Sequence, residues 1–151
     1  LMAITSAVCN SFKVLALTGK MDFTASTGDS YKLALFTSSA TINKSTTDYS
    51  TTNEMTNTSG TAYTAGGIAL TNVTPVLDSD TAVCDFSDVS WTSATFTANG
   101  CMIYNTTTGT GSSTTDTVCT IAFGADKTVT SGTFTIQFPA AAAATAILAL
   151  A

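Results

Sequence analysis

Two carboxylates and the chain's one tryptophan stand close together in the stretch DFSDVSW, which begins at Asp85. Asp85 and Asp88 are three residues apart, a spacing that can bring two carboxyl groups to the roughly 5 to 9.5 Å used by the acid and base of glycosidases. Trp91 would then offer an aromatic platform beside them. Aspartates at strand ends and turns, however, usually accept hydrogen bonds from nearby backbone N–H groups. We favour this second interpretation, in which Asp85 and Asp88 punctuate strands.

Other catalytic and metal-binding patterns are weak. The sequence contains no histidine, so a serine, threonine or cysteine nucleophile lacks its usual activating base. Asp78, Asp80 and Asp85 carry oxygen ligands suited to calcium, but their spacing does not match an EF-hand loop. A solvated acidic turn explains them more simply. We therefore predict that the chain is not an enzyme and that it has no cofactor and no metal site.

The four cysteines are Cys9, Cys84, Cys101 and Cys119. They allow about three fully paired disulfide connectivities, and the sequence does not choose among them. Each has apolar or β-branched neighbours, which favours free, buried thiols over disulfides.

The composition argues against some partners. Charged residues make up 10% of the chain and the net charge is −5, whereas about 25% charged residues is usual. Nucleic-acid binding requires a basic surface, and a membrane span requires about 18 consecutive apolar residues. We therefore predict neither partner. So few charges leave little repulsion between copies, which favours assembly.

Hydrophobic periodicity predicts one helix near the start of the chain. Ile4, Val8, Phe12 and Leu15 recur at helical spacing, which places them on one face of a helix at 3–18. We expect this amphipathic helix to pack on the body of the protein or on a neighbouring chain.

From residue 31 onward the apolar period is close to two, as in a β-strand. The predicted strands are 31–37, two within 63–76 on either side of Gly66-Gly67, 81–86, 89–97, 100–105, 117–124, 133–139 and 147–150. Asn99-Gly100 is a typical signal for a two-residue hairpin turn, and Ser131-Gly132 is expected to close another turn region. The alanines after Pro139 could also open a helix, but a terminal strand at 147–150, buried on both faces, is favoured.

These patterns predict an all-β fold, an antiparallel β-sandwich or barrel of about eight strands with a short N-terminal helix. Abundant threonine suits the solvent face of such strands. We expect one domain over residues 1–151. Residues 38–62 are polar and form a surface excursion, where mobility or partner contacts are expected.

Several motifs occur in order over nearly the whole chain, among them GDSYKLALFTSSATI, YTAGGIALTNVTPV and AFGADKTVTSGTFTIQFP. Together they resemble a family of small virion structural proteins of tailed bacteriophages, and also the cement, or decoration, proteins of phage capsids. The resemblance implies a β-sandwich-like fold and symmetric, multi-copy binding to the outer capsid surface of the virion. It implies the major capsid protein and other copies of this chain, as a trimer or dimer, as partners. The poly-alanine run at 140–144 departs from the family pattern.

A cement protein acts by binding alone, because it bridges neighbouring shell subunits and many weak contacts add up through symmetry. The expected interface anchors are apolar or aromatic residues in exposed segments: Phe12, Leu15, Tyr49, Met55 and Tyr63. Core packing is the alternative for each of them. The alternative functions are a tail or fibre component that binds glycans through exposed tyrosines and Trp91, and a filament subunit that assembles by itself.

Overall fold

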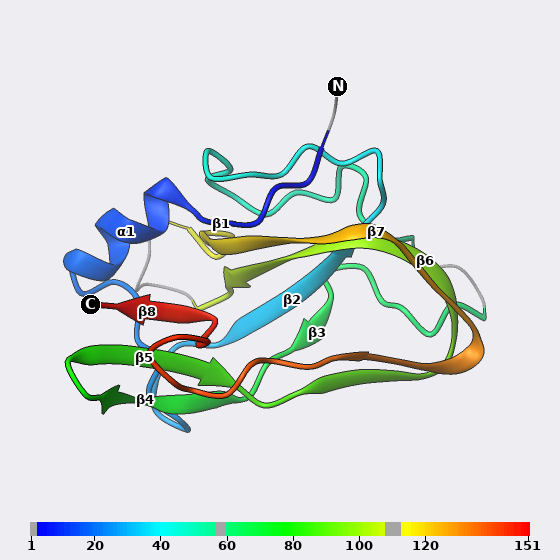
Figure 1. Cartoon of the computed structure of the whole chain (residues 1–151). Helices are drawn as coiled ribbons and strands as arrows, with labels where there is room; N and C mark the ends of the chain where they lie inside the picture. Colours follow the sequence, from blue (N-terminus) through cyan, green and yellow to red (C-terminus); the bar gives the residue numbers. More distant parts are fainter. Residues whose placement is uncertain (1–2, 57–59, 108–112) are drawn as a thin grey trace.

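The computed structural model describes residues 3–56, 60–107 and 113–151. Its elements are β1 (Ala7–Val8), α1 (Asn10–Leu17), β2 (Tyr31–Phe36), β3 (Ile68–Ala69), β4 (Asn72–Asp78), β5 (Thr81–Phe86), β6 (Val89–Asn105), β7 (Thr117–Ile136) and β8 (Leu148–Leu150). A larger antiparallel sheet has the order β1-β7-β6-β2-β3, and a smaller one has the order β4-β5-β8 (Figure 1). The all-β class with a short N-terminal helix is thus confirmed, as a sandwich and not as a closed barrel.

One long hairpin, formed by β6 and β7, dominates the fold. The two strands pair from Val89 with Ile136 to Tyr104 with Thr117, and the register shifts at several points between. Such shifts mark β-bulges, which bend a strand without ending it. Figure 1 shows the result: the hairpin curves at one end, so that residues 89–98 and 127–136 run on the side of the smaller sheet.

The predicted turns at Asn99-Gly100 and Ser131-Gly132 are therefore wrong, because both dipeptides lie inside these long strands. Gly100 serves close packing, since a Cβ at this position would collide with the Ile121 carbonyl and the Ile4 side chain. Asn-Gly favours a hairpin turn only where the chain has no neighbour to pair with. Here Gly100 pairs with Phe36 of β2 and Ala122 of β7, and the pairing with β7 continues on both sides of the dipeptide.

The main core lies between the two layers. Along the first half of β6, Trp91, Ala94, Phe96 and Ala98 are buried, whereas the intervening serines and threonines are exposed. The three-residue step from Trp91 to Ala94 coincides with a register shift, which restores the inward phase of the strand. On the outer face, hydroxyl pairs join the strands, as in Thr97 with Thr128 at 2.8 Å. The threonine-rich solvent face is thus present.

The N-terminal helix is shorter than predicted. Residues 7 and 8 form β1, which pairs with Thr120 and Cys119 of β7, and the helix begins at Asn10. The prediction of a helix at 3–18 is wrong for residues 3–9. The edge of β7 provides backbone hydrogen bonds to this segment, whereas the first turn of a helix is costly to form. Ile4 accordingly packs in a cluster on the outer face of the larger sheet.

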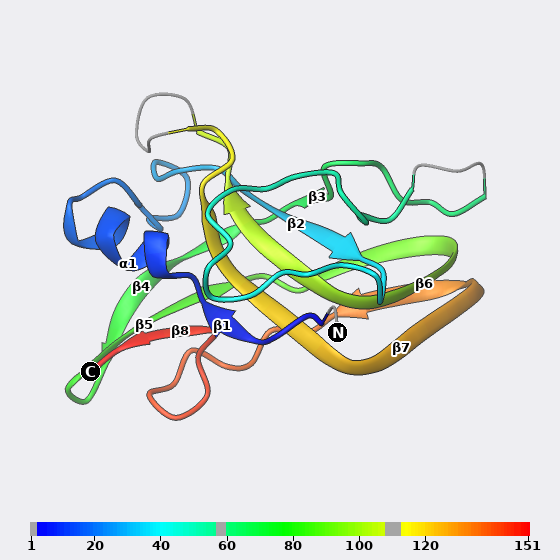
Figure 2. The same cartoon turned by 90° about the horizontal axis from the view of Figure 1, so that it is seen from above.

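The polar excursion is packed onto the protein over most of its length. We call residues 37–56 the cover, because they lie over the outer face of β2 and β6 (Figure 2). Ala40 and Ile42 of the cover are buried against Phe36 and Met102 of the sheet. Both faces of β2 are consequently buried, as the sequence predicted. The cover still lies at the surface, where many of its polar side chains are exposed. Mobility or partner contacts in this excursion stay a prediction, and residues 57–59 lie outside the described residues.

The remaining predictions concern turns and the C-terminal segment. Gly66 and Gly67 form the expected turn, both with positive φ, and Gly67 could not carry a Cβ because the Leu33 carbonyl occupies that space. Residues 148–150 form a strand paired with β5, so the strand interpretation of the C-terminal segment is confirmed over the helix. In the described part of the chain, no helix has the length and apolar character needed to cross a membrane.

Candidate functional site

Asp85 and Asp88, the candidate catalytic pair, accept hydrogen bonds from the backbone. The Asp85 carboxylate accepts a hydrogen bond from the N–H of Phe86 at 2.7 Å, and Asp88 accepts one from the N–H of Phe138 at 2.8 Å. Trp91 is buried beside Phe96 and Phe134, which form tilted and edge-on ring contacts with one another and with it. These residues therefore provide no exposed aromatic platform next to a pair of free carboxylates.

The calcium alternative has no support in the geometry. Asp78 accepts a hydrogen bond from the N–H of Ala143 at 2.7 Å and so anchors the segment before β8. Within residues 3–56, 60–107 and 113–151, no group of three or more histidine, cysteine, aspartate or glutamate side chains is placed to hold a metal ion.

All four cysteines are free thiols, as predicted. Cys101 and Cys119 are buried in the larger sheet and Cys9 is buried between β1 and α1, whereas Cys84 on β5 is half-buried. Burial raises the pKa of each thiol, that of Cys119 to about 12. The thiolate is the reactive form of cysteine, so none of the four is tuned as a nucleophile.

Tyr49 and Tyr63, two of the predicted interface residues, belong to a buried polar cluster around Glu54. Both phenol groups donate to the Glu54 carboxylate, at 2.6 and 2.7 Å, and the N–H of Gly66 donates to it at 2.7 Å. Burial and the neighbouring carboxylate raise the pKa values of Tyr49 and Tyr63. We call these residues the Glu54 cluster; it fixes the cover to the sheet.

Three of the predicted anchors are thus occupied within the fold. Tyr63 is 1% exposed and Met55 is 8% exposed, so neither presents a surface to a partner. Tyr49 is half-buried and stacks on Tyr104 with a centroid distance of 4.3 Å. For these three residues, core packing is the interpretation that the structure supports.

Phe12 and Leu15, the other two predicted anchors, lie on α1 and are half-buried. Leu15 lines a small pocket beside Asp48 and Asp116. Phe12 lines a much larger one and contacts Phe23 edge-on at 5.9 Å. The interface role of these two residues stays a prediction.

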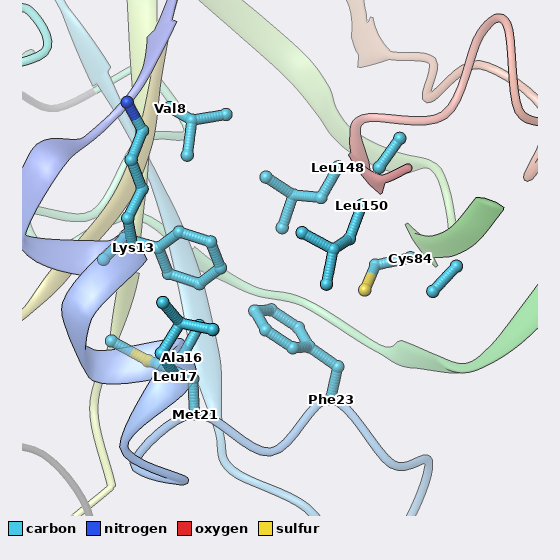
Figure 3. A pocket seen from close by; sticks show the side chains of 12 residues that line it. Val8, Lys13, Ala16, Leu17, Met21, Phe23, Cys84, Leu148 and Leu150 are labelled. Atoms are coloured by element: carbon cyan, nitrogen blue, oxygen red, sulfur yellow. The ribbon is translucent and has the colours of Figure 1, made fainter.

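The larger pocket has a volume of about 540 Å³ and lies between α1 and the smaller sheet (Figure 3). We call it the α1/β8 pocket. Twelve residues line it: Val8, Phe12, Lys13, Ala16, Leu17, Met21, Phe23, Ala82, Cys84, Leu148, Ala149 and Leu150. Eleven of them carry no charge, and Lys13 is the exception. The volume of the α1/β8 pocket falls within the roughly 300–1,000 Å³ of typical binding pockets.

The rim of this pocket exposes large apolar side chains. Leu17 at the end of α1 is 83% exposed and Leu150 on β8 is 70% exposed. Figure 3 places the α1 residues on one side of the pocket and Leu148, Leu150 and Cys84 on the other. An apolar rim around an apolar hollow is a surface that binds by removing water from both partners. It contains no nucleophile with a base and no pair of carboxylates.

The sequence prediction missed this pocket except for Phe12. Leu17 falls outside the helix face that was used to predict α1, and Leu148 and Leu150 were assigned to a strand buried on both faces. The available signal was the uncharged segment Ala146–Ala151, because such a strand needs apolar neighbours on every side or leaves some of its side chains exposed.

No protein-family model, no curated protein and no solved structure matches the chain.

Proposed function

We propose that this chain is a virion structural protein of a tailed bacteriophage: a decoration protein that binds the outer surface of the head in many copies and stabilises it. The observation that carries the proposal is the α1/β8 pocket with its exposed rim of Leu17 and Leu150. Such a surface suits a role in which binding itself is the function. The ordered sequence motifs that resemble phage virion proteins supply the identity of the partner, the major capsid protein.

Two further features support binding over catalysis. The aspartates that first suggested chemistry accept backbone hydrogen bonds. The net charge of −5 is spread over few ionisable side chains, so little charge must be desolvated when two surfaces meet. Many such contacts, repeated by the symmetry of a shell, give high avidity from weak individual sites.

The alternative of a glycan-binding tail or fibre component loses its main support. It required an exposed aromatic platform, and Trp91 is buried. A self-assembling filament subunit is separated from a decoration protein by sedimentation, because the purified decoration protein remains a small oligomer.

The proposal is tested with heads of the encoding phage that lack this protein. Purified protein should co-sediment with these heads, and cryo-electron microscopy should place it on the shell in symmetry-related copies. Leu17→Ser and Leu150→Ser should each weaken binding about tenfold or more, since burying a leucine contributes about 1.5–3 kcal/mol. Leu77→Ser is the matched control, because Leu77 is 73% exposed on β4 and does not line the pocket.

Two results would contradict this proposal. One is a protein found at the tail and absent from the head. The other is a pair of pocket variants that bind heads as tightly as the Leu77 control.

A further inference from the structure

The two sheets of the sandwich have four edge strands, β1, β3, β4 and β8. An edge strand has backbone N–H and C=O groups that can pair with another chain, and proteins usually block such edges by shortening, covering or bending them. β1 is two residues long, and the backbone at Thr5 and Asn10 on either side of it donates to Ile42 and Lys44 of the cover. β3 is also two residues long.

The edge strand β4 is blocked by several devices. Pro75 removes one backbone donor, and the register shifts between Val73 and Val76. The N–H of Ala25 donates to the Thr74 hydroxyl at 3.0 Å, and the Asn72 side chain donates to the Asp29 carbonyl at 2.9 Å. The segment before β2 therefore covers this edge.

The edge strand β8 is three residues long, but it has none of the other devices that block β4. The segment Ala146–Ala151 contains no charged residue and no proline. β5 pairs with one edge of β8, and in the described part of the chain no strand pairs with the other. Figure 1 shows β8 between β5 and α1, so this second edge is turned toward α1.

The α1/β8 pocket lies on the same side as this free edge. Leu148 and Leu150 are two residues apart and both line the pocket, as expected for side chains that share one face of a strand. An additional strand beside β8 would direct every second side chain into the same apolar space. Backbone pairing would supply affinity, and the pocket would select apolar side chains.

The charge at the pocket adds one further requirement. Lys13 is the single charged residue among the twelve that line it, and its Nζ lies 3.4 Å from the Asn10 side chain. An acidic group on the incoming segment complements this cation, whereas a basic group would be repelled. The occupant that fits is an extended, apolar peptide segment with a carboxylate beside Lys13 in the first half of α1.

We propose that an extended segment of the head protein pairs with the free edge of β8 as a fourth strand of the smaller sheet and places apolar side chains in the α1/β8 pocket. This inference rests on the proposed function, because it names the element of the partner that the decoration protein binds.

Cys84 provides a reporter for the pocket, and the amides of β8 provide one for the edge. Cys84 lines the pocket and is half-buried, whereas the other three cysteines are buried. N-ethylmaleimide labelling and hydrogen exchange are measured on the free protein and on the protein bound to heads. Cys84→Ala identifies the labelled site. We expect head binding to slow both Cys84 labelling and β8 amide exchange by about tenfold or more.

Each other outcome decides against the inference. If Cys84 is protected but the β8 amides exchange as in the free protein, the pocket holds an isolated side chain or a small apolar molecule, and strand pairing is wrong. If the protein binds heads with both reporters unchanged, the inference fails and the proposed function stands. If both reporters are protected in a dimer of purified protein, the occupant is a second copy. If the protein does not bind heads, the proposed function fails, and the inference fails with it.

Discussion

The cover and the α1/β8 pocket are two regions where other segments pack against the sandwich, and they differ in how far their apolar side chains are buried. The cover is closed: Ile42 and Met55 are buried, and Glu54 accepts hydrogen bonds from Tyr63 and Gly66 in the segment before β3. Tyr63 in turn accepts one from the N–H of Leu35 on β2 at 2.9 Å. The α1/β8 pocket is open, and Leu17 and Leu150 stand exposed at its rim.

The two regions are held in place by different kinds of interaction. The cover is rich in serine, threonine and asparagine and gains little from burial, so a buried carboxylate with matched donors specifies its position. Helix α1 and β8 are apolar where they face each other, and apolar contact is not directional. Without a partner between them they leave a hollow.

The largest expected effect on stability comes from removing the Glu54 carboxylate that holds the cover in place. Glu54→Ala leaves two tyrosine hydroxyls and the N–H of Gly66 without their acceptor, so we expect a loss of about 3 to 5 kcal/mol in the free energy of unfolding. Urea unfolding followed by Trp91 fluorescence measures it. Glu54→Gln, which keeps the shape and one acceptor oxygen, should lose less. A loss below about 1 kcal/mol for the alanine variant would show that the Glu54 cluster does not hold the cover.

Alkaline pH should act on the same region. Burial and Glu54 raise the pKa values of Tyr49 and Tyr63, and that of Tyr104 is raised to about 12. In the unfolded chain these phenols ionise near pH 10. The unfolded state therefore releases these phenol protons first. The contribution of these tyrosines to stability is constant below about pH 10 and falls above it by about 1.4 kcal/mol per pH unit for each such tyrosine.

Urea unfolding between pH 8 and 11 checks this sign and slope. Tyr49→Phe should make the alkaline decline shallower, whatever the stability of that variant at neutral pH. An unchanged slope would mean that Tyr49 titrates in the folded protein as it does in the unfolded chain.

The smallest expected effect lies at the open pocket. Leu17→Ser should change the free energy of unfolding by less than about 0.5 kcal/mol, because the side chain is almost fully exposed. The same variant is expected to weaken head binding. A large loss of stability would instead make Leu17 part of the fold, and the contrast between the two regions would disappear.

Much of the fold was predictable from the spacing of apolar residues. The two-residue period of β2 and of the end of β7, and the glycine turn before β3, led to an all-β sandwich with about eight strands. The failures share one physical cause, which is tertiary pairing. Asn99-Gly100 has the chemistry of a turn, but Gly100 is paired with β2 on one side and with β7 on the other. Residues 3–9 have the period of a helix but lie along the edge of β7.

The candidate site was predictable only in part. Phe12 was found because it repeats on the helix face. For Tyr49, Met55 and Tyr63 the sequence did not decide between an interface role and core packing, since a segment so rich in hydroxyl groups gives no sign that it surrounds a buried carboxylate. Leu17 and Leu150 were missed because local sequence does not tell which face of a terminal element lacks a neighbour.

The continuous β6–β7 hairpin has a mechanical consequence. Because the same two strands run along both layers, a force that pulls one layer from the other meets unbroken backbone at the bend as well as side-chain contacts. Any opening of the sandwich must therefore start at the opposite end, where α1 and β8 face each other across the pocket. The peptide segment proposed for the α1/β8 pocket would therefore bind at the end opposite the bend.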